Sequence, residues 1–352
     1  MNSDNWKGRD FLAETDFTKA EIEHILDLSV KLKDDRRKGK FHDDLLRTKT
    51  LFMIFYNQSL RTRNSFEAGM TQLGGHAHYL DPGKIYTPAI EGKEVAYKTE
   101  RVSDVARVLA RMGEAIAIRC YGDPVDWVYG GAHELLAEFA KWAEIPVLNM
   151  EDDIYHPFQG LADVLTVKEK FGGFKGINFT MSWAYSPSVH KPRAVPHSAV
   201  LLATMMGMNV TLSYPDGMEL DSTITSQCEQ YARASNGGFH ITHNFEEGIS
   251  GAHVVYPKAW CPVALFKAPV GSDDPRGAQE IFDHNKSWKC TNATMDLADK
   301  NAIYLHCLPA DRGYEVSNEV IDKTDGAGWT SAVFDQAENR LHVEKAVMSL
   351  VM

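Results

Sequence analysis

The sequence predicts an α/β protein of two domains, each built around a doubly wound parallel sheet. Short apolar runs of strand length alternate with amphipathic helical patterns along most of the 352 residues, a pattern typical of consecutive βαβ units. The length suits two domains of roughly 150 residues each. Hydrophobic residues make up 44% of the chain and charged residues 24%, so each domain can bury a core of its own.

The first half carries four predicted strands with helices between them. One helix begins at Thr18, where Glu21 completes a T-x-x-E capping box. Another helix ends at Gly74 and Gly75, because glycine adopts the left-handed conformation that closes many helices. The expected strands cover residues 51–56, 76–80, 115–119 and 147–150.

The second half repeats this pattern beyond a boundary near residues 150–156. A helix is expected over residues 198–206 and a terminal helix over 335–352, whereas 267–289, rich in Asp, Gly, Pro and Lys, predicts a long loop. The expected strands cover residues 179–183, 210–213, 253–256 and 303–305.

Composition restricts the partners and the location. A formal charge of −11 argues against nucleic acid, which needs a basic surface, so an anionic substrate must be held by a local group of Arg and Lys. Five cysteines without a C-x-x-C pair do not suggest disulfides and predict a reducing, cytoplasmic setting. The polar N-terminus and the lack of about 18 consecutive apolar residues predict neither a signal peptide nor a membrane span.

The sharpest local signal is a strand that leads directly into a helix start at residues 57–63. Ser59 is placed as the N-cap, so the first helical amides would present an anion site at the positive end of the helix dipole. Arg61 and Arg63 add guanidinium groups that match phosphate oxygens. The alternative is an ordinary capped helix whose arginines are solvated or paired with Glu67. The amides expected to face the anion are those of Leu60, Arg61 and Thr62.

Residues 59–63 read S-L-R-T-R, which resembles the S-T/M-R-T-R carbamoyl-phosphate motif of the aspartate/ornithine transcarbamylase family. Further motifs follow in the family's order and at about its spacing. They are Arg119 at a strand end, H-P-F-Q at 156–159, H-C-L-P at 306–309 and E-N-R at 338–340. The resemblance therefore covers most of the chain and implies a carbamoyltransferase.

The resemblance also implies the roles of the motif residues. Arg119 and His156, with Thr62, would reach the carbonyl oxygen of carbamoyl phosphate, while Gln159 and the Leu308 carbonyl would hold its NH2 group. The other implied residues are Ser59, Leu60, Arg61 and Arg340 at the phosphate and Cys307 beside the attacking amine. Carbamoyl phosphate carries its own leaving group, so no metal or other cofactor is expected.

The family's organisation gives three further expectations. Residues 1–155 would form the carbamoyl-phosphate domain, with the helix 335–352 returning to it, and residues 156–334 would bind the second substrate. The chain would form a homotrimer with its sites at subunit interfaces. Carbamoyl phosphate and a small amino acid would be the partners, without nucleic acid or membrane.

Sequence features, mainly of the second domain, indicate the acceptor substrate. The family's ornithine enzymes carry an Asp in a D-x-x-x-S-M-G segment for the substrate's α-ammonium, where this chain has Lys258. A lysine repels an ammonium and suits a carboxylate, which favours an N-acylated ornithine. Residues 183–196 resemble the knotted loop of the N-acetylornithine and N-succinylornithine enzymes, a rare exception to unthreaded chains. Glu100 lies about where the acetylornithine enzymes have Glu and the succinylornithine enzymes have Pro, so it favours the acetylornithine type. Glu151 is expected to line the pocket of the second substrate.

Some segments depart from this subgroup and leave the acceptor open. Tyr86 to Pro88 stand where a neighbouring subunit would lend a tryptophan, and Ala310-Asp311 follow H-C-L-P instead of an arginine and a lysine-bearing segment. These stretches are closer to an orphan, catabolic branch of knotted transcarbamylases. Another amine, a ureido substrate or free ornithine thus remain alternatives.

Two other classes of protein share part of this pattern. A nicotinamide-dependent oxidoreductase would need G-x-G-x-x-G after a strand, and the glycines at 172–176 precede one instead. A phosphate-sensing protein without catalysis would share the anion site, and product formation from carbamoyl phosphate distinguishes the two.

Overall fold

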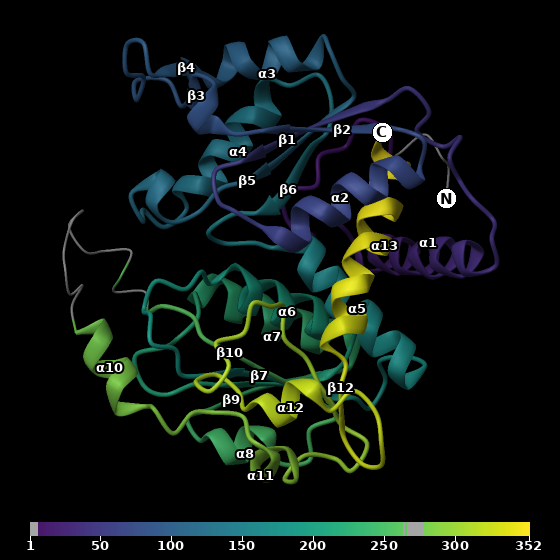
Figure 1. Cartoon of the computed structure of the whole chain (residues 1–352). Coiled ribbons are helices and arrows are strands. Elements are labelled where there is room, and N and C mark those ends of the chain that lie inside the picture. Colours follow the sequence, from purple (N-terminus) through teal and green to yellow (C-terminus); the bar gives the residue numbers. More distant parts are fainter. Residues whose placement is uncertain (1–5, 263–264, 266–276) are drawn as a thin grey trace. The chain divides into compact units, whose positions relative to one another are not determined.

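The computed structural model describes residues 6–262, 265 and 277–352. The chain divides into two compact units, which we call the first unit (Met1–Leu161 and Arg340–Met352) and the second unit (Ala162–Asn339). Each contains a parallel sheet covered by helices (Figure 1). The predicted α/β class with two parallel sheets is therefore confirmed.

The sheet of the first unit has the order β2-β1-β5-β6, with all strands parallel. The inner strands β1 and β5 and the edge strand β6 are almost wholly buried, because helices cover both faces of such a sheet. Arg119 at the end of β5 pairs in register with Phe55 and Glu151, so the strand ends bring these residues to one edge. The strands are β1 Thr50–Phe55, β2 His76–Leu80, β5 Ala115–Arg119 and β6 Val147–Glu151.

The helices of the first unit follow the predicted capping signals. The Thr18 and Glu21 capping box opens α1 (Lys19–Arg37), and Ser59 caps α2 (Leu60–Gln72). Gly74 has a φ of 86° just beyond α2, as its place after the helix predicts. The remaining elements are η2 Glu14–Asp16, η3 Pro82–Lys84, β3 Thr87–Ala89, β4 Thr99–Arg101, α3 Val102–Ala110, η4 Asp123–Val125 and α4 Gly131–Trp142.

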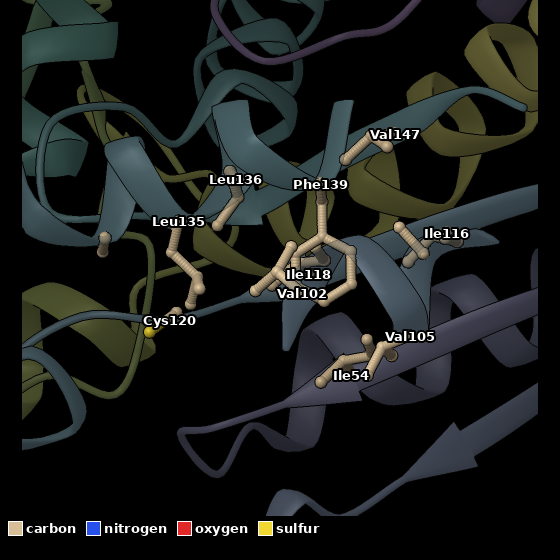
Figure 2. Close-up of a cluster of buried hydrophobic side chains, with 12 residues drawn as sticks. Ile54, Val102, Val105, Ile116, Ile118, Cys120, Leu135, Leu136, Phe139 and Val147 are labelled. Atoms are coloured by element: carbon tan, nitrogen blue, oxygen red, sulfur yellow. The ribbon is translucent and has the colours of Figure 1, made fainter. Parts of the chain in front are cut away.

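A hydrophobic core joins the first sheet to α3 and α4 (Figure 2). Phe139 of α4 is completely buried among Val102 of α3 and Ile116 and Ile118 of β5. Truncating such a buried aromatic side chain to alanine typically costs about 3–5 kcal/mol. This packing fixes the strands whose ends carry Arg119 and Glu151.

The second unit contains a six-stranded parallel sheet of order β12-β11-β10-β7-β8-β9. Its strands are β7 Asn178–Trp183, β8 Asn209–Ser213, β9 Gly238–Thr242, β10 Val254–Lys258, β11 Ile303–Tyr304 and β12 Thr330–Ser331. Its helices are α6 Ala194–Met205, α7 Ser222–Ser235, α8 Phe245–Ile249, α10 Ala278–His284, α11 Asn292–Met295 and α12 Asn318–Asp322.

Two long helices cross the division between the units. These are α5 (Pro157–Phe171) and α13 (Val333–Val351). The terminal helix expected over 335–352 is thus present, two residues longer at its start. Within the described residues, no helix is long and apolar enough to cross a lipid bilayer.

Three local expectations were incomplete. The edge strands β9 and β12 were not predicted, because β9 is only partly buried and β12 has just two residues. Helix α6 begins at Ala194, earlier than expected, and takes Pro196 into its first turn, where a missing N–H costs no hydrogen bond. Of the expected loop 267–289, residues 278–284 form α10, and 267–276 lie outside the described residues.

Candidate active site

The start of α2 forms the predicted capped helix end. The Ser59 Oγ accepts a hydrogen bond from the Thr62 N–H at 3.2 Å, and its backbone is extended, with φ −154° and ψ 124°. Leu60 is exposed and Arg61 is half-buried at this helix start. The first amides of a helix lack intrahelical acceptors, so they can receive an anion.

Arg340 of α13 connects three of the sequence motifs inside the first unit. Its Nη1 donates to Gln159 Oε1 at 3.0 Å, and its Nη2 donates to Thr62 Oγ1 at 3.1 Å. Nε and Nη2 both donate to Glu344 Oε1, at 3.2 and 3.1 Å. The side chain is only 2% exposed. The segments 59–63, 156–159 and 338–340 therefore meet at one buried guanidinium group.

Arg119 and His156 share one carboxylate in the same cluster. Glu151 Oε2 forms a buried ion pair with Arg119 Nη1 and lies 3.4 Å from His156 Nε2. Arg119 Nη2 also donates to the Tyr121 hydroxyl at 3.0 Å, and His156 Nε2 lies 3.4 Å from Arg340 Nη1. Buried charges need such partners. Glu151 was expected to line the second-substrate pocket, and here it contacts the two predicted oxyanion donors of the first unit.

Arg63 does not join this cluster of side chains. Its Nε donates to Glu67 Oε1 at 2.9 Å, and its guanidinium lies 4.0 Å from the centre of the Tyr79 ring. Both ends of the ion pair are substantially exposed. Of the two arginines in the S-L-R-T-R segment, Arg63 thus follows the alternative in which it pairs with Glu67.

A turn rich in carboxylates holds His156 in place. Asp152 Oδ1 accepts from the amides of Ile154 and Tyr155, at 2.7 and 2.5 Å. Asp153 accepts from the amides of Gly130 and His133 at the start of α4, and burial, with the neighbouring Asp152 charge, raises the pKa of Asp153 to about 6. These two acids were not predicted; Asp152 fixes the backbone that precedes His156, and Asp153 ties the same turn to the start of α4.

In the second unit, the H-C-L-P segment follows β11 in a fixed backbone conformation. The His306 N–H donates to Gln336 Oε1, and the Leu308 N–H donates to His306 Nδ1, both at 2.9 Å. Leu308 has a φ of 55°, which is uncommon for a residue other than glycine and is typical of functional sites. Cys307 is half-buried between them. The Leu308 carbonyl is therefore held in a defined direction.

Glu315 connects this segment with Lys258. Its carboxylate accepts from the amides of Ala259 and Asp311, each at 2.7 Å, and lies 3.2 Å from His306 Nε2. Burial alone would raise the pKa of Glu315, but the His306 ring, Lys258 and the Ala259 amide outweigh it and hold this pKa at about 2. Lys258, buried at the end of β10, donates to the Ala259 carbonyl at 3.0 Å.

Asp311 joins the Pro-rich segment to the residues after H-C-L-P. Its Oδ2 accepts from Ser186 Oγ and from Lys191 Nζ, both at 2.6 Å. The predicted knot in segment 183–196 stays a prediction. Glu100 lies on β4, opposite Pro88 of β3, with an exposed side chain.

The structure thus groups the predicted residues in two sets, with Glu100 outside both. The set in the first unit is Thr62, Arg119, Glu151, His156, Gln159 and Arg340, beside the helix start at Ser59, Leu60 and Arg61. The set in the second unit is Lys258, Cys307 and Leu308, arranged around His306 and Glu315. Sequence reasoning missed Glu344 and Glu315; for Glu344, its i,i+4 spacing from Arg340 was an available signal. Among the described residues, no group of three His, Cys, Asp or Glu side chains could hold a metal ion.

An α/β fold of two parallel sheets, with buried Arg, His and Gln side chains beside a capped helix start, suits an enzyme that acts on a phosphorylated substrate. Comparison with known families agrees. Residues 9–169 match the model of the aspartate/ornithine carbamoyltransferase carbamoyl-P binding domain, and residues 191–351 match that of the Asp/Orn binding domain. The chain belongs to the aspartate/ornithine carbamoyltransferase family, and it is a carbamoyltransferase.

Similar proteins carry two different names for the acceptor. An ornithine carbamoyltransferase of Thermococcus kodakarensis is 36% identical over 345 residues, covering 98% of this chain and 96% of that protein. An N-acetylornithine carbamoyltransferase of Xanthomonas campestris is 35% identical over 351 residues, covering 97% of each. The family is therefore the predicted one, and the relatives do not agree on one acceptor.

Solved structures match over nearly the whole chain. A variant of N-acetyl-L-ornithine transcarbamylase, complexed with carbamyl phosphate and N-succinyl-L-norvaline, aligns with a TM-score of 0.88 at 33% identity, covering 98% of this chain and all of the other. The ornithine carbamoyltransferase from Pyrococcus furiosus aligns with a TM-score of 0.81 at 35% identity, covering 98% and 97%. The transcarbamylase fold is thus confirmed.

Proposed function

We propose that this enzyme transfers the carbamoyl group of carbamoyl phosphate to the amino group of an N-acylated, ornithine-like amino acid of the N-acetylornithine type, releasing phosphate. The observation that carries the proposal is the buried network in which Arg340 joins Thr62 and Gln159 beside the start of α2. The N-acetylornithine name of one set of relatives supports the acceptor class.

The first unit supplies all but one of the residues that we propose for the donor. The amides at the start of α2, together with Arg61 and Arg340, bind the phosphate, because a helix N-terminus and guanidinium groups both favour a dianion. Thr62, Arg119 and His156 donate to the carbonyl oxygen. Gln159 accepts from the carbamoyl NH2, as does the Leu308 carbonyl. Ser59 keeps the helix start capped, and Leu60 contributes its amide.

The reaction is a direct acyl transfer. The acceptor's neutral amine attacks the carbonyl carbon, and the carbonyl electrons move onto oxygen to form a tetrahedral oxyanion. The bond from carbon to the ester oxygen then breaks, its electron pair leaves with phosphate, and the amine's proton passes to that phosphate. Donors fixed before the reaction stabilise the oxyanion without reorganisation. No metal or cofactor is needed because the donor supplies its own leaving group.

The acceptor is proposed to lie against the second unit. Lys258 is buried at the carboxyl end of β10, where it suits the substrate's carboxylate and disfavours a free α-ammonium. Cys307 lies beside the attacking amine. Free ornithine is the second candidate, favoured by the ornithine carbamoyltransferase name of several relatives. The departures at Ala310 and Asp311 keep another amine or a ureido substrate as an alternative.

A homotrimer completes the proposal. The segment around β3 and β4, which carries Glu100, would reach a neighbouring subunit's acceptor site. Large apolar side chains exposed on this segment support a role in subunit contact. They are Ile85, Tyr86, Val95 and Tyr97, at 41%, 53%, 50% and 92% exposure.

A transfer assay with labelled carbamoyl phosphate tests the function. The enzyme is incubated with N-acetylornithine, N-succinylornithine, ornithine, putrescine, aspartate and ureido-type amines, and N-acetylornithine is expected to gain label. Arg61→Ala should abolish labelling while its circular dichroism matches the wild type, because the change removes one phosphate contact. Labelling of ornithine alone would overturn the acceptor assignment, and wild-type activity of Arg61→Ala would overturn the donor site.

A further inference from the structure

Glu344 is a buried carboxylate directly behind the proposed phosphate arginine. It lies one turn after Arg340 on α13 and is fully buried, at 0% exposure. Its Oε1 accepts two hydrogen bonds from Arg340, and the Ser65 hydroxyl is the other hydrogen-bonding group beside the carboxylate. Burying a carboxylate is costly even when it is paired. A carboxylate that also weakens the positive charge of a phosphate ligand therefore requires an explanation.

This pair differs from an ordinary helix ion pair. Exposed i,i+4 pairs contribute little to stability because water screens them. Here both side chains are buried, at 3% and 0% exposure, so their charges interact strongly. A change in the charge of one partner must therefore change the proton affinity of the other.

The groups around Glu344 come from four elements. Arg340 is the cation on its own helix, and the Ser65 hydroxyl approaches from α2. On the far side of Arg340 lie His156 and Gln159 at the start of α5, with Glu151 of β6 beyond His156. Burial raises the pKa of Glu344 to about 7, against the opposing effects of Arg340 and Ser65. The carboxyl group is thus able to change its protonation near neutral pH.

We propose that Glu344 is a positioning residue of the phosphate site, which directs the Arg340 guanidinium toward Thr62 and Gln159 and takes up a proton from solvent when phosphate binds. The same proton returns to solvent when phosphate leaves. This inference rests on the proposed function, because it takes Arg340 to be a phosphate ligand.

The direction of the proton transfer follows from charge. Without an anion, the positive Arg340 stabilises the Glu344 carboxylate. A phosphate dianion on Arg340 offsets that positive charge and adds negative charge nearby, so the protonated carboxyl becomes favoured. Above neutral pH, the ionised Glu344 opposes phosphate binding and so assists release of the product.

Phosphate affinity as a function of pH tests the proton coupling. Dissociation constants for inorganic phosphate are measured by calorimetry between about pH 6 and pH 8.5 for the wild type and Glu344→Gln. The two should agree at the acid end, where Glu344 is protonated, and Glu344→Gln should bind about tenfold tighter at the alkaline end, since one pKa unit corresponds to a factor of ten. Asp335→Asn, which removes an exposed carboxylate of α13, should follow the wild type.

Two further measurements make the test decisive. In buffers of different ionisation enthalpy, the wild type at about pH 8 should take up more protons per phosphate than Glu344→Gln, and this comparison removes phosphate's own titration. Glu344→Leu cannot accept from Arg340, so it should bind phosphate more weakly than Glu344→Gln at every pH. If Glu344→Gln does not fold, the number of protons that the wild type takes up per phosphate is compared with the number that the titration of phosphate itself accounts for. An excess supports the proposal, and no excess overturns it.

A different result would contradict each of the proton coupling, the positioning role and the proposed donor site. Parallel affinity curves for the wild type and Glu344→Gln would overturn the proton coupling, and equal affinities of Glu344→Leu and Glu344→Gln would overturn the positioning role. The double variant Arg340→Gln with Glu344→Gln should lose phosphate binding. Wild-type affinity in that double variant would instead overturn the proposed donor site.

Discussion

At the scale of single residues, both units bury charged side chains. Arg340 with Glu344, Arg119 with Glu151, and Glu315 beside the His306 ring are each almost completely shielded from solvent. Replacing buried pairs by apolar residues often leaves stability unchanged or raises it, so stability alone does not explain them. Fixed charges in a low-dielectric site stabilise a developing oxyanion strongly, which is what carbamoyl transfer requires.

Glu315 gives a pH-dependent prediction. Its folded pKa of about 2 lies below the ordinary value of 4.5, so its ionised form stabilises the fold above about pH 4.5 and this contribution is lost as the pH falls toward 2. Glu315→Gln should therefore lower the free energy of unfolding by about 3 kcal/mol at neutral pH, and the difference should shrink below pH 4.5. Urea unfolding at several pH values measures it.

The control for this experiment is Glu246→Gln, since Glu246 is an exposed acid of α8 in the same unit. It should leave the unfolding curve within about 0.5 kcal/mol of the wild type. If the free energy of unfolding of Glu315→Gln stays below that of the wild type by the same amount from pH 7 to pH 3, the carboxylate charge is not what stabilises the strand ends.

The motif residues could be predicted from the sequence, but their partners could not. Recognisable sequence patterns contain Ser59, Thr62, His156, Gln159 and Arg340. These patterns predict the helix cap at Ser59 and the grouping of the other four residues. Glu315 accepts from an amide 56 residues away, and no local pattern specifies such a distant contact. Arg63 pairs with Glu67, the alternative that the sequence left open, and the alternation of arginines does not reveal that β2 brings Tyr79 against it.

At the scale of elements, the strand-to-helix connection from β1 to α2 presents the anion site. The buried strand fixes where the chain leaves the sheet, Ser59 fixes where the helix begins, and Gly74 ends it at a φ of 86°. A side chain at Gly74 would place its Cβ 1.8 Å from the Asp43 carbonyl oxygen. Both ends of α2 are therefore specified by residues visible in the sequence.

Ser59→Ala tests the function of that cap. The change removes the acceptor for the Thr62 amide, so it should cost about 1 kcal/mol of stability and raise the KM for carbamoyl phosphate severalfold. Thr18→Ala removes the comparable cap of α1 and should cost a similar free energy without changing KM. Equal KM values in the two variants would show that the start of α2 does not contribute to substrate binding.

Strands with a continuous apolar run were predicted, and some of the short or half-exposed elements were not. The apolar runs of β1, β5, β7 and β10 gave strands at nearly their observed limits, because strands buried on both faces read as continuous hydrophobic segments. The strand β9, with a half-exposed pattern, and the seven-residue α10 offered no comparable periodicity. Edges and short helices depend on tertiary contacts, which the sequence does not display.

At the scale of the whole molecule, the order of the motifs predicted the family, and the full-length similarity to carbamoyltransferases confirms it. The predicted donor residues other than Leu308 fall in the first unit, whereas Leu308 and the acceptor residues Lys258 and Cys307 fall in the second. The acceptor could not be fixed in the same way, since relatives of about 35% identity carry both names. We therefore propose that the phosphate of the donor is bound by residues of the first unit and the acceptor by residues of the second.

The most direct test compares the dissociation constant of carbamoyl phosphate, without acceptor, in two variants. The double variant Arg340→Gln with Glu344→Gln removes the ion pair without leaving a buried charge, and Lys258→Gln changes only the second unit. The double variant should bind carbamoyl phosphate about a hundredfold more weakly, since charge-assisted hydrogen bonds to phosphate are lost, and Lys258→Gln should bind it within about threefold of the wild type. Intact binding in the double variant, or a comparable loss in Lys258→Gln, would contradict the assignment of the donor to the first unit.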